Sequence, residues 1–191
     1  MSGAGKGERR RPAPAIGAPR AGAGASRRGG RPRTGARLAA VQALYQSEAN
    51  NEPAEVVIDQ FIRHRIGPDE RGRGLEEGQV PEADVPLFAS IVRKAAQNGE
   101  TLDRILAAHL DKDWPLPRLD PVLRALLRCA CCELWAGRDP PARVVINEYL
   151  DIAHGFFGGE EPRFANGVMD ALARTLRADE FQGSAAARRD G

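Results

Sequence analysis

The sequence lacks a long run of apolar residues, and this absence excludes proteins that span a membrane with helices. Its most apolar stretch, from Val122 to Trp135, is too short to cross a bilayer. No apolar segment near the start has the form of a signal-peptide core, and the first residues hold too many glycines and prolines for an amphipathic transit helix. These absences predict a protein that stays in the cytoplasm.

The motifs of common enzymes are also missing. The sequence contains no glycine-rich phosphate loop of either standard spacing, no pair of histidines one helical turn apart and no Gly-x-Ser-x-Gly turn. Its three histidines, His64, His109 and His154, stand alone in predicted helices, as surface or helix-end histidines commonly do. We therefore expect no catalysis, no cofactor and no bound metal.

Cysteines are few, and their positions exclude a disulfide framework. Cys129, Cys131 and Cys132 crowd into one helical turn, where neighbours point in different directions, and no histidine lies close by to complete a metal site. We interpret them as small apolar packing residues in a reducing compartment. A redox or metal-binding role is the alternative.

The alternation of apolar and polar residues that marks β-strands is absent, whereas helical spacing recurs along the chain. The expected fold class is all-α, with about seven helices around one central buried helix. The ranges with helical spacing are 36–49, 54–66, 87–95, 101–110, 119–135, 143–156 and 162–176.

The range 119–135 is the expected centre of the fold. Only three residues between Val122 and Trp135 are charged, so a helix here is apolar around nearly its whole circumference and is predicted to be buried. Asp120 is suited to the N-cap, a proline follows at the first helical position, and Gly137 marks the end of the helix.

The net charge of +2 conceals a segregation of charge along the chain. Residues 1–37 carry ten Lys and Arg against one acid, whereas the remainder carries 18 basic and 25 acidic residues. Residues 1–35 are Gly, Ala, Pro and Arg without apolar periodicity, so we expect a disordered basic arm that either contacts phosphate backbones or only improves solubility. A helical domain is expected over 36–178, with a loop insertion at 67–83, and a disordered tail over 179–191.

Cationic, amide and aromatic side chains meet at two predicted helix ends. Arg33 and Arg37 lead into the first helix, and Arg163, Phe164 and Asn166 open the last one. Arginine offers planar donors to phosphate and stacks on bases, and an exposed Phe gives a stacking platform that tolerates any base. This set suits single-stranded RNA, whose bases are splayed out. Phe164 fits the core face of its helix equally well.

Four stretches of the chain carry a family pattern together: ARLAAVQALYQ (36–46), LLRCACCEL (126–134), PARVVINEYLDIA (141–153) and RFANGVMDAL (163–172). In this order and spacing they resemble the signature stretches of the transcription antitermination factor NusB family. Any one stretch is weakly specific, but four in register that end in Phe-x-Asn-Gly-Val are specific.

The resemblance implies an all-helical, NusB-like fold of two small bundles without catalytic activity. It implies binding of the boxA segment of ribosomal RNA leader transcripts together with NusE, a ribosomal protein, and action on elongating RNA polymerase. Without NusE we expect a monomer or a weak homodimer. The RNA-binding residues that the resemblance implies are Arg33, Arg37, Gln42, Tyr45, Arg128, Arg163, Phe164 and Asn166.

Some positions depart from the family pattern. Cys132 replaces a frequent aromatic residue, which loosens packing, and Ala165 replaces a valine. Arg143 replaces a lysine and so keeps the positive charge. Thr34 and Gly35 thin the arginine cluster at the start of the first helix.

Two other functions stay open on the sequence. The first alternative is a detached RNA-binding domain that works with a ribosomal-RNA methyltransferase. The second is a helical scaffold that binds only protein. Titration with boxA RNA, with and without NusE, separates the three functions. Within the central helix, Arg128 is expected either to pair internally, with Glu148 as the candidate, or to meet an RNA phosphate.

Overall fold

The computed structural model describes residues 31–66, 80 and 82–186, and every regular element in these ranges is helical. The expected all-α class is therefore confirmed, with eight α-helices in the described residues where about seven were expected. They are α1 (Arg31–Asn50), α2 (Ala54–His64), α3 (Val85–Gln97), α4 (Gly99–Ala107), α5 (Pro121–Ala136), α6 (Ala142–Phe156), α7 (Glu161–Leu176) and α8 (Asp179–Ala186), with a 3-10 turn, η1 (Leu116–Arg118), before α5.

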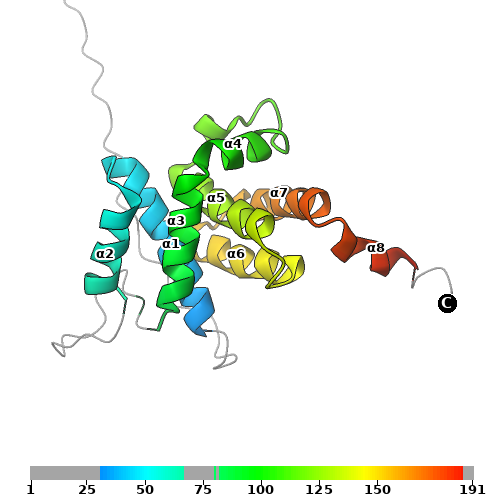
Figure 1. Ribbon diagram of the computed structural model, residues 1–191. Helices are drawn as coiled ribbons and strands as arrows, with labels where there is room; N and C mark the ends of the chain where they lie inside the picture. Colours follow the sequence, from blue (N-terminus) through cyan, green and yellow to red (C-terminus); the bar gives the residue numbers. More distant parts are fainter. Residues whose placement is uncertain (1–30, 67–79, 81, 187–191) are drawn as a thin grey trace, which may run out of the picture.

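Helix α5 lies at the centre of the molecule, as the sequence predicts. Helices α1, α3, α4, α6 and α7 all pack against it (Figure 1). Asp120 caps the helix, because its Oδ1 accepts from the backbone nitrogens of Val122 at 2.8 Å and Leu123 at 3.2 Å. None of the described helices is long and apolar enough to cross a membrane.

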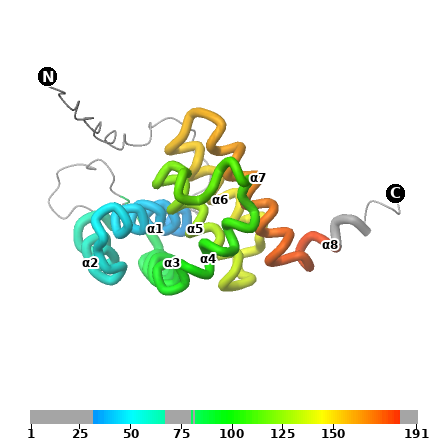
Figure 2. The backbone as a smooth tube through the Cα atoms, turned by 90° about the horizontal axis from the view of Figure 1, so that it is seen from above, coloured from blue at the N-terminus to red at the C-terminus, as the bar shows by residue number. Residues whose placement is uncertain are grey.

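The helices form two groups that meet at α5. Helices α1, α2 and α3 pack on one another, and α4, α6 and α7 complete the second group. Figures 1 and 2 place α2 and α8 at opposite ends of the molecule. The start of α7, where Phe164 lies, belongs to the second group, and Phe164 contacts Trp114 in the segment that follows α4.

Helix α1 begins at Arg31, before the expected start at residue 36. Tertiary contacts order its first turn: Asp84 N donates to Pro32 O at 2.8 Å, and Thr34 Oγ1 donates to a carboxylate of α6 at 2.7 Å. Gly35 is required here, because a Cβ at this position would lie 2.4 Å from the Glu82 carbonyl oxygen. Residues 1–30 of the expected arm lie outside the described residues.

The first part of the expected disordered tail is helical, because residues 179–186 form α8. Arg177, which is only 1% exposed, joins α8 to the end of α5 by donating to backbone carbonyls there. Most of the expected loop 67–83 lies outside the described residues. Val80, near its end, is buried and donates its N–H to Arg65 O at 2.8 Å.

The three cysteines lie in the core, where the packing interpretation places them. Cys129, Cys131 and Cys132 are all buried in α5. Burial is the main cause that raises the pKa of Cys131 to about 12 and that of Cys132 to about 11. A thiol that holds its proton is a poor nucleophile.

We therefore expect the native protein to resist thiol reagents at pH 8. Labelling with a chromogenic disulfide should modify none of the three cysteines in buffer and all three in denaturant, because only unfolding exposes them. Labelling of the native protein at the rate seen in denaturant would contradict this expectation and would favour the redox alternative.

Candidate functional site

The eight implied RNA-binding residues lie at separate places in the structure. Two of them, Arg37 and Arg128, belong to ion-pair networks on opposite halves of α5. Gln42 and Tyr45 are partly buried on α1, near whose start Arg33 is exposed. The other three lie in the first turns of α7. These are the residues Arg163, Phe164 and Asn166.

Arg37 is buried between α5 and α6 and is 1% exposed. Its Nε and Nη2 donate to the two carboxylate oxygens of Glu133, both at 2.9 Å, and its Nη1 lies 3.4 Å from Glu148 Oε2. Tyr149 Oη also donates to Glu133, at 2.8 Å. The Arg37 guanidinium therefore positions the start of α1, and its role as an RNA-binding residue stays a prediction.

The charges around Arg37 outweigh the cost of its burial. Burial alone lowers the pKa of an arginine, but the hydrogen bond and the charge of Glu133 act in the opposite direction, and the resulting pKa lies above the ordinary value. Burial raises the pKa of the Tyr149 hydroxyl well above its ordinary value, with Glu133 as the next cause. Arg37 therefore stays charged and Tyr149 stays a donor across the physiological range.

Arg128 pairs internally, but the expected partner, Glu148, was wrong. Its Nε and Nη2 donate to the carboxylate of Asp103 on α4 at 2.6 and 2.7 Å, and its Nη1 pairs with Glu48 on α1. Glu148, on α6, instead packs against the first turn of α1, where its carboxylate accepts a hydrogen bond from Thr34 Oγ1. The reason is orientation: the stripe of α5 that carries Arg128 faces α4 and the C-terminal half of α1.

The partly exposed face of α1 holds Gln42 and Tyr45. Tyr45 packs against the core without being covered. The carbonyl oxygen of the Gln42 side chain is buried and has no hydrogen-bond partner among the described residues. Both stay predictions as RNA-binding residues.

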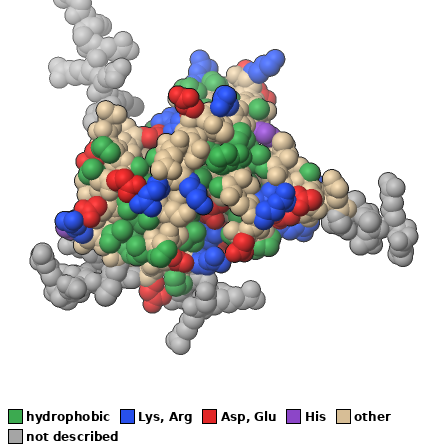
Figure 3. Space-filling model, in the orientation of Figure 1, with side chains coloured by type: hydrophobic (Ala, Val, Ile, Leu, Met, Phe, Trp, Pro, Cys, Tyr) green, Lys and Arg blue, Asp and Glu red, His purple; other side chains and the backbone are tan. Residues whose placement is uncertain are grey.

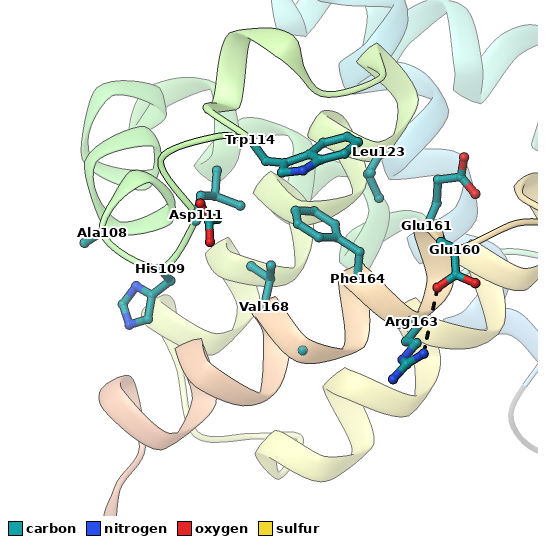
Figure 4. Close-up of a pocket in the computed structure, with 12 residues that line it drawn as sticks. Ala108, His109, Asp111, Trp114, Leu123, Glu160, Glu161, Arg163, Phe164 and Val168 are labelled. Carbon is teal, nitrogen blue, oxygen red and sulfur yellow. Dashed lines mark ion pairs between the residues drawn. The ribbon is translucent and has the colours of Figure 1, made fainter.

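A groove of about 750 Å³ opens between α7 and the segment that follows α4. Trp114 and Phe164 stand together in it, with ring centroids 6.0 Å apart and planes tilted by 42° (Figure 4). Leu123 of α5 and Val168 of α7 supply apolar lining. His109 links the two walls, because its Nδ1 lies 2.8 Å from Ile105 O and its Nε2 lies 3.0 Å from Thr175 Oγ1.

The rim of the groove carries charges of both signs. Asp111, Glu160 and Glu161 line it together with Arg163, whose side chain is 89% exposed. Arg163 lies 3.9 Å from Glu160 and points away from the aromatic pair (Figure 4). The three carboxylates repel a phosphate inside the groove, whereas they do not repel an uncharged ring. The Arg163 side chain stays accessible outside the groove.

Trp114 is the residue that the sequence did not assign to the site. Trp114 is 58% exposed, so its ring does not fill the interior. Its neighbours Asp113 and Pro115 do signal a surface segment. Their spacing from α7 carries no information about the contact with Phe164, because that contact depends on how α4 and α7 pack.

Charges are mixed on the face of the molecule that Figure 3 shows. Figure 3 shows Lys and Arg side chains beside Asp and Glu side chains across one face of the molecule, without a broad region of a single sign. The groove therefore differs from the surrounding surface by its aromatic pair more than by its charge.

Comparison with known proteins finds one family for this chain. The model of the NusB family matches residues 34–174. A transcription antitermination protein NusB from Granulibacter bethesdensis is 58% identical over 153 residues, which are 80% of this chain and 94% of that protein. The protein of the same name from Gluconobacter oxydans is 51% identical over 144 residues, 75% of this chain and 88% of its own length.

Solved structures are similar in fold. NusB of T. maritima has a TM-score of 0.62 with this chain at 28% identity, over 79% of this chain and 97% of that one. A crystal structure of the antitermination factors NusB and NusE in complex with double-stranded RNA has a TM-score of 0.59 at 21% identity. That similarity covers 74% of this chain and 96% of the solved one, and at this identity it concerns the fold alone.

Proposed function

Because this chain belongs to the NusB family of transcription antitermination proteins, we propose that it binds single-stranded RNA through the groove between α7 and the segment after α4. The factor is not an enzyme, as the sequence predicts. The RNA is the boxA segment of ribosomal RNA leader transcripts, and the chain acts in the cytoplasm on elongating RNA polymerase.

The contact between Trp114 and Phe164 carries this proposal. An exposed tryptophan beside a half-buried phenylalanine leaves aromatic faces open to solvent, which costs free energy unless a partner covers them. RNA bases stack on such faces whatever their sequence, and arginine at the rim contacts the phosphates. Arg163 and the exposed Asn166 stand on the same helix turns as Phe164.

The partner in the proposed assembly is NusE. A solved structure of NusB and NusE with RNA supports this assignment for a member of the same family. Basic residues of the segment 1–30, which lies outside the described residues, are proposed to add attraction to any RNA. Alone, the chain is proposed to be a monomer or a weak homodimer.

Replacing Trp114 or Phe164 by alanine should weaken boxA RNA binding by about 5- to 150-fold each, because base stacking on an aromatic ring contributes about 1–3 kcal/mol. Fluorescence anisotropy of labelled RNA measures the dissociation constant, with and without NusE. Trp135→Ala is the matched control, since Trp135 is 42% exposed but lies outside the groove lining.

Three outcomes decide between RNA binding in the groove, RNA binding elsewhere and binding of protein alone. Loss of affinity in both groove variants but not in Trp135→Ala supports the proposal. Equal affinity for all four proteins places the RNA site elsewhere. Binding of NusE with no binding of RNA favours a scaffold that contacts only protein.

A further inference from the structure

Gly167 stands in the middle of α7, where a glycine is unfavourable. Glycine in a helix interior is less stable than alanine, because the unfolded chain has more freedom to lose. Such a glycine usually has an internal reason, either a backbone angle that other residues avoid or a close neighbour. Gly35 shows the second case, since a Cβ there would lie 2.4 Å from Glu82 O.

Gly167 has neither internal reason. Its backbone is helical, and a Cβ built at this position finds no atom within 4 Å outside its own helix backbone and chain neighbours. The protein itself would accept a side chain here. The space that the missing side chain leaves is therefore part of the surface and not of the packing.

That surface is the wall of the groove. Gly167 lines the groove three residues after Phe164 and next to Val168, and it is exposed. A side chain at this position would enter open space at the groove lining. The glycine thus enlarges the groove at a cost to the helix, which indicates that something packs closely against its Cα.

We propose that Gly167 is an RNA-contacting residue whose bare Cα forms the wall against which one nucleobase ring of the bound RNA lies. The proposal rests on the proposed function, because it names what the same groove receives. The occupant is the flat ring and not the phosphate, since Asp111, Glu160 and Glu161 line the groove and repel an anion. The phosphate of that nucleotide lies outside the groove, on the side to which the exposed Arg163 side chain points (Figure 4).

Two substitutions of graded size test the proposal. Gly167→Ala removes the helix penalty and adds one methyl group, and Gly167→Leu fills the groove. We expect Gly167→Leu to weaken boxA RNA binding by about tenfold or more, the loss of one stacked base, with a smaller loss for Gly167→Ala. Both proteins should melt at or above the temperature of the unmodified protein, because alanine and leucine favour the helix.

Tryptophan fluorescence reports whether the groove itself is occupied. The chain has two tryptophans, so the change Trp135→Phe leaves Trp114 as the single reporter. In that background RNA should quench the emission, and Gly167→Leu should abolish the quenching. Gly99→Ala is the matched control, because a Cβ at Gly99 also meets open space but lies outside the groove.

Each outcome bears on one of the two claims. If Gly167→Leu binds RNA as tightly as the unmodified protein while Trp114→Ala does not, the inference about Gly167 is overturned and the RNA function stands. If the unmodified protein binds no RNA, the proposed function fails first. If Gly167→Leu weakens binding of NusE and leaves RNA affinity unchanged, a protein occupies the groove, and the inference is again overturned. Gly167→Ala decides the question if the leucine variant does not fold.

Discussion

Replacing Glu133 by alanine is expected to lower the free energy of unfolding by about 3–5 kcal/mol, because the change leaves a buried guanidinium without its carboxylate. The side chains of Arg37 and Glu133 are only 2% and 9% exposed, and two hydrogen bonds of 2.9 Å join them. Tyr149 loses its acceptor in the same variant. Urea denaturation followed by circular dichroism measures the effect.

The control for this prediction is an ion pair of the same charges on the surface. Asp59 and Arg63 lie one helical turn apart on α2, with side chains 56% and 67% exposed. Asp59→Ala should cost less than about 0.5 kcal/mol, since water screens an exposed pair. Equal costs for Glu133→Ala and Asp59→Ala would show that the buried network adds no stability.

A double variant separates the loss of an interaction from the cost of a stranded charge. Arg37→Met combined with Glu133→Leu removes both charges and keeps most of the volume. Apolar replacement of a whole buried pair is often neutral or stabilising, so the double variant should be more stable than Glu133→Ala. A double variant that is less stable would mean that the pair itself, and not the stranded guanidinium, dominates.

Replacing Arg177 by methionine is expected to lower the free energy of unfolding by about 3–5 kcal/mol, because it leaves buried carbonyl oxygens without donors. Arg177 donates to Glu133 O at 2.5 Å, Leu134 O at 2.9 Å and Pro140 O at 2.7 Å. Helix α5 has no basic residue in its own last turn, so this arginine also supplies the positive charge that a helix C-terminus favours. Thermal and urea denaturation both report the loss.

Two further variants sharpen the test of Arg177. Lysine keeps the charge but cannot span three carbonyls with a planar group, so Arg177→Lys should recover only part of the stability. Arg104→Met is the control, since Arg104 is exposed on α4 and should change stability by less than about 0.5 kcal/mol. A small effect of Arg177→Met would indicate that water replaces the guanidinium.

The Arg177 variants also separate stability from binding. Arg177 follows the C-terminal end of α7, whereas the groove lies at the N-terminal half of that helix. RNA affinity measured well below the melting temperature should therefore match that of the unmodified protein. The groove variants should show the reverse pattern, with affinity lost and stability kept.

Much of the local structure follows from the sequence. The helical spacing of apolar residues locates seven of the eight described helices, and Asp120 caps α5 as its residue type predicts. These features depend on neighbours within one or two turns, so the sequence contains them directly. The residue types at the start of the last helix already indicated Arg163, Phe164 and Asn166, of which Arg163 and Phe164 line the groove.

Features that depend on distant contacts were predicted less well. The start of α1 and the first residues of α8 lack strong apolar periodicity, so they were assigned to flexible segments. Each becomes helical through partners far away in the chain: Thr34 bonds to Glu148, and Ala142 N donates to Glu180 Oε2 at 2.6 Å. Such ordering is invisible in a window of neighbouring residues.

The sequence by itself determined the helical class, the central buried helix and the family to which the chain belongs. Only the tertiary structure decided which charges meet: Arg37 with Glu133, 96 positions away, and Arg128 with Asp103, 25 positions away. It also brought Trp114 to Phe164 and left Gly167 bare beside them. The physical reason is that periodicity and capping act within a helix, whereas the choice of partner depends on how whole helices are oriented against one another.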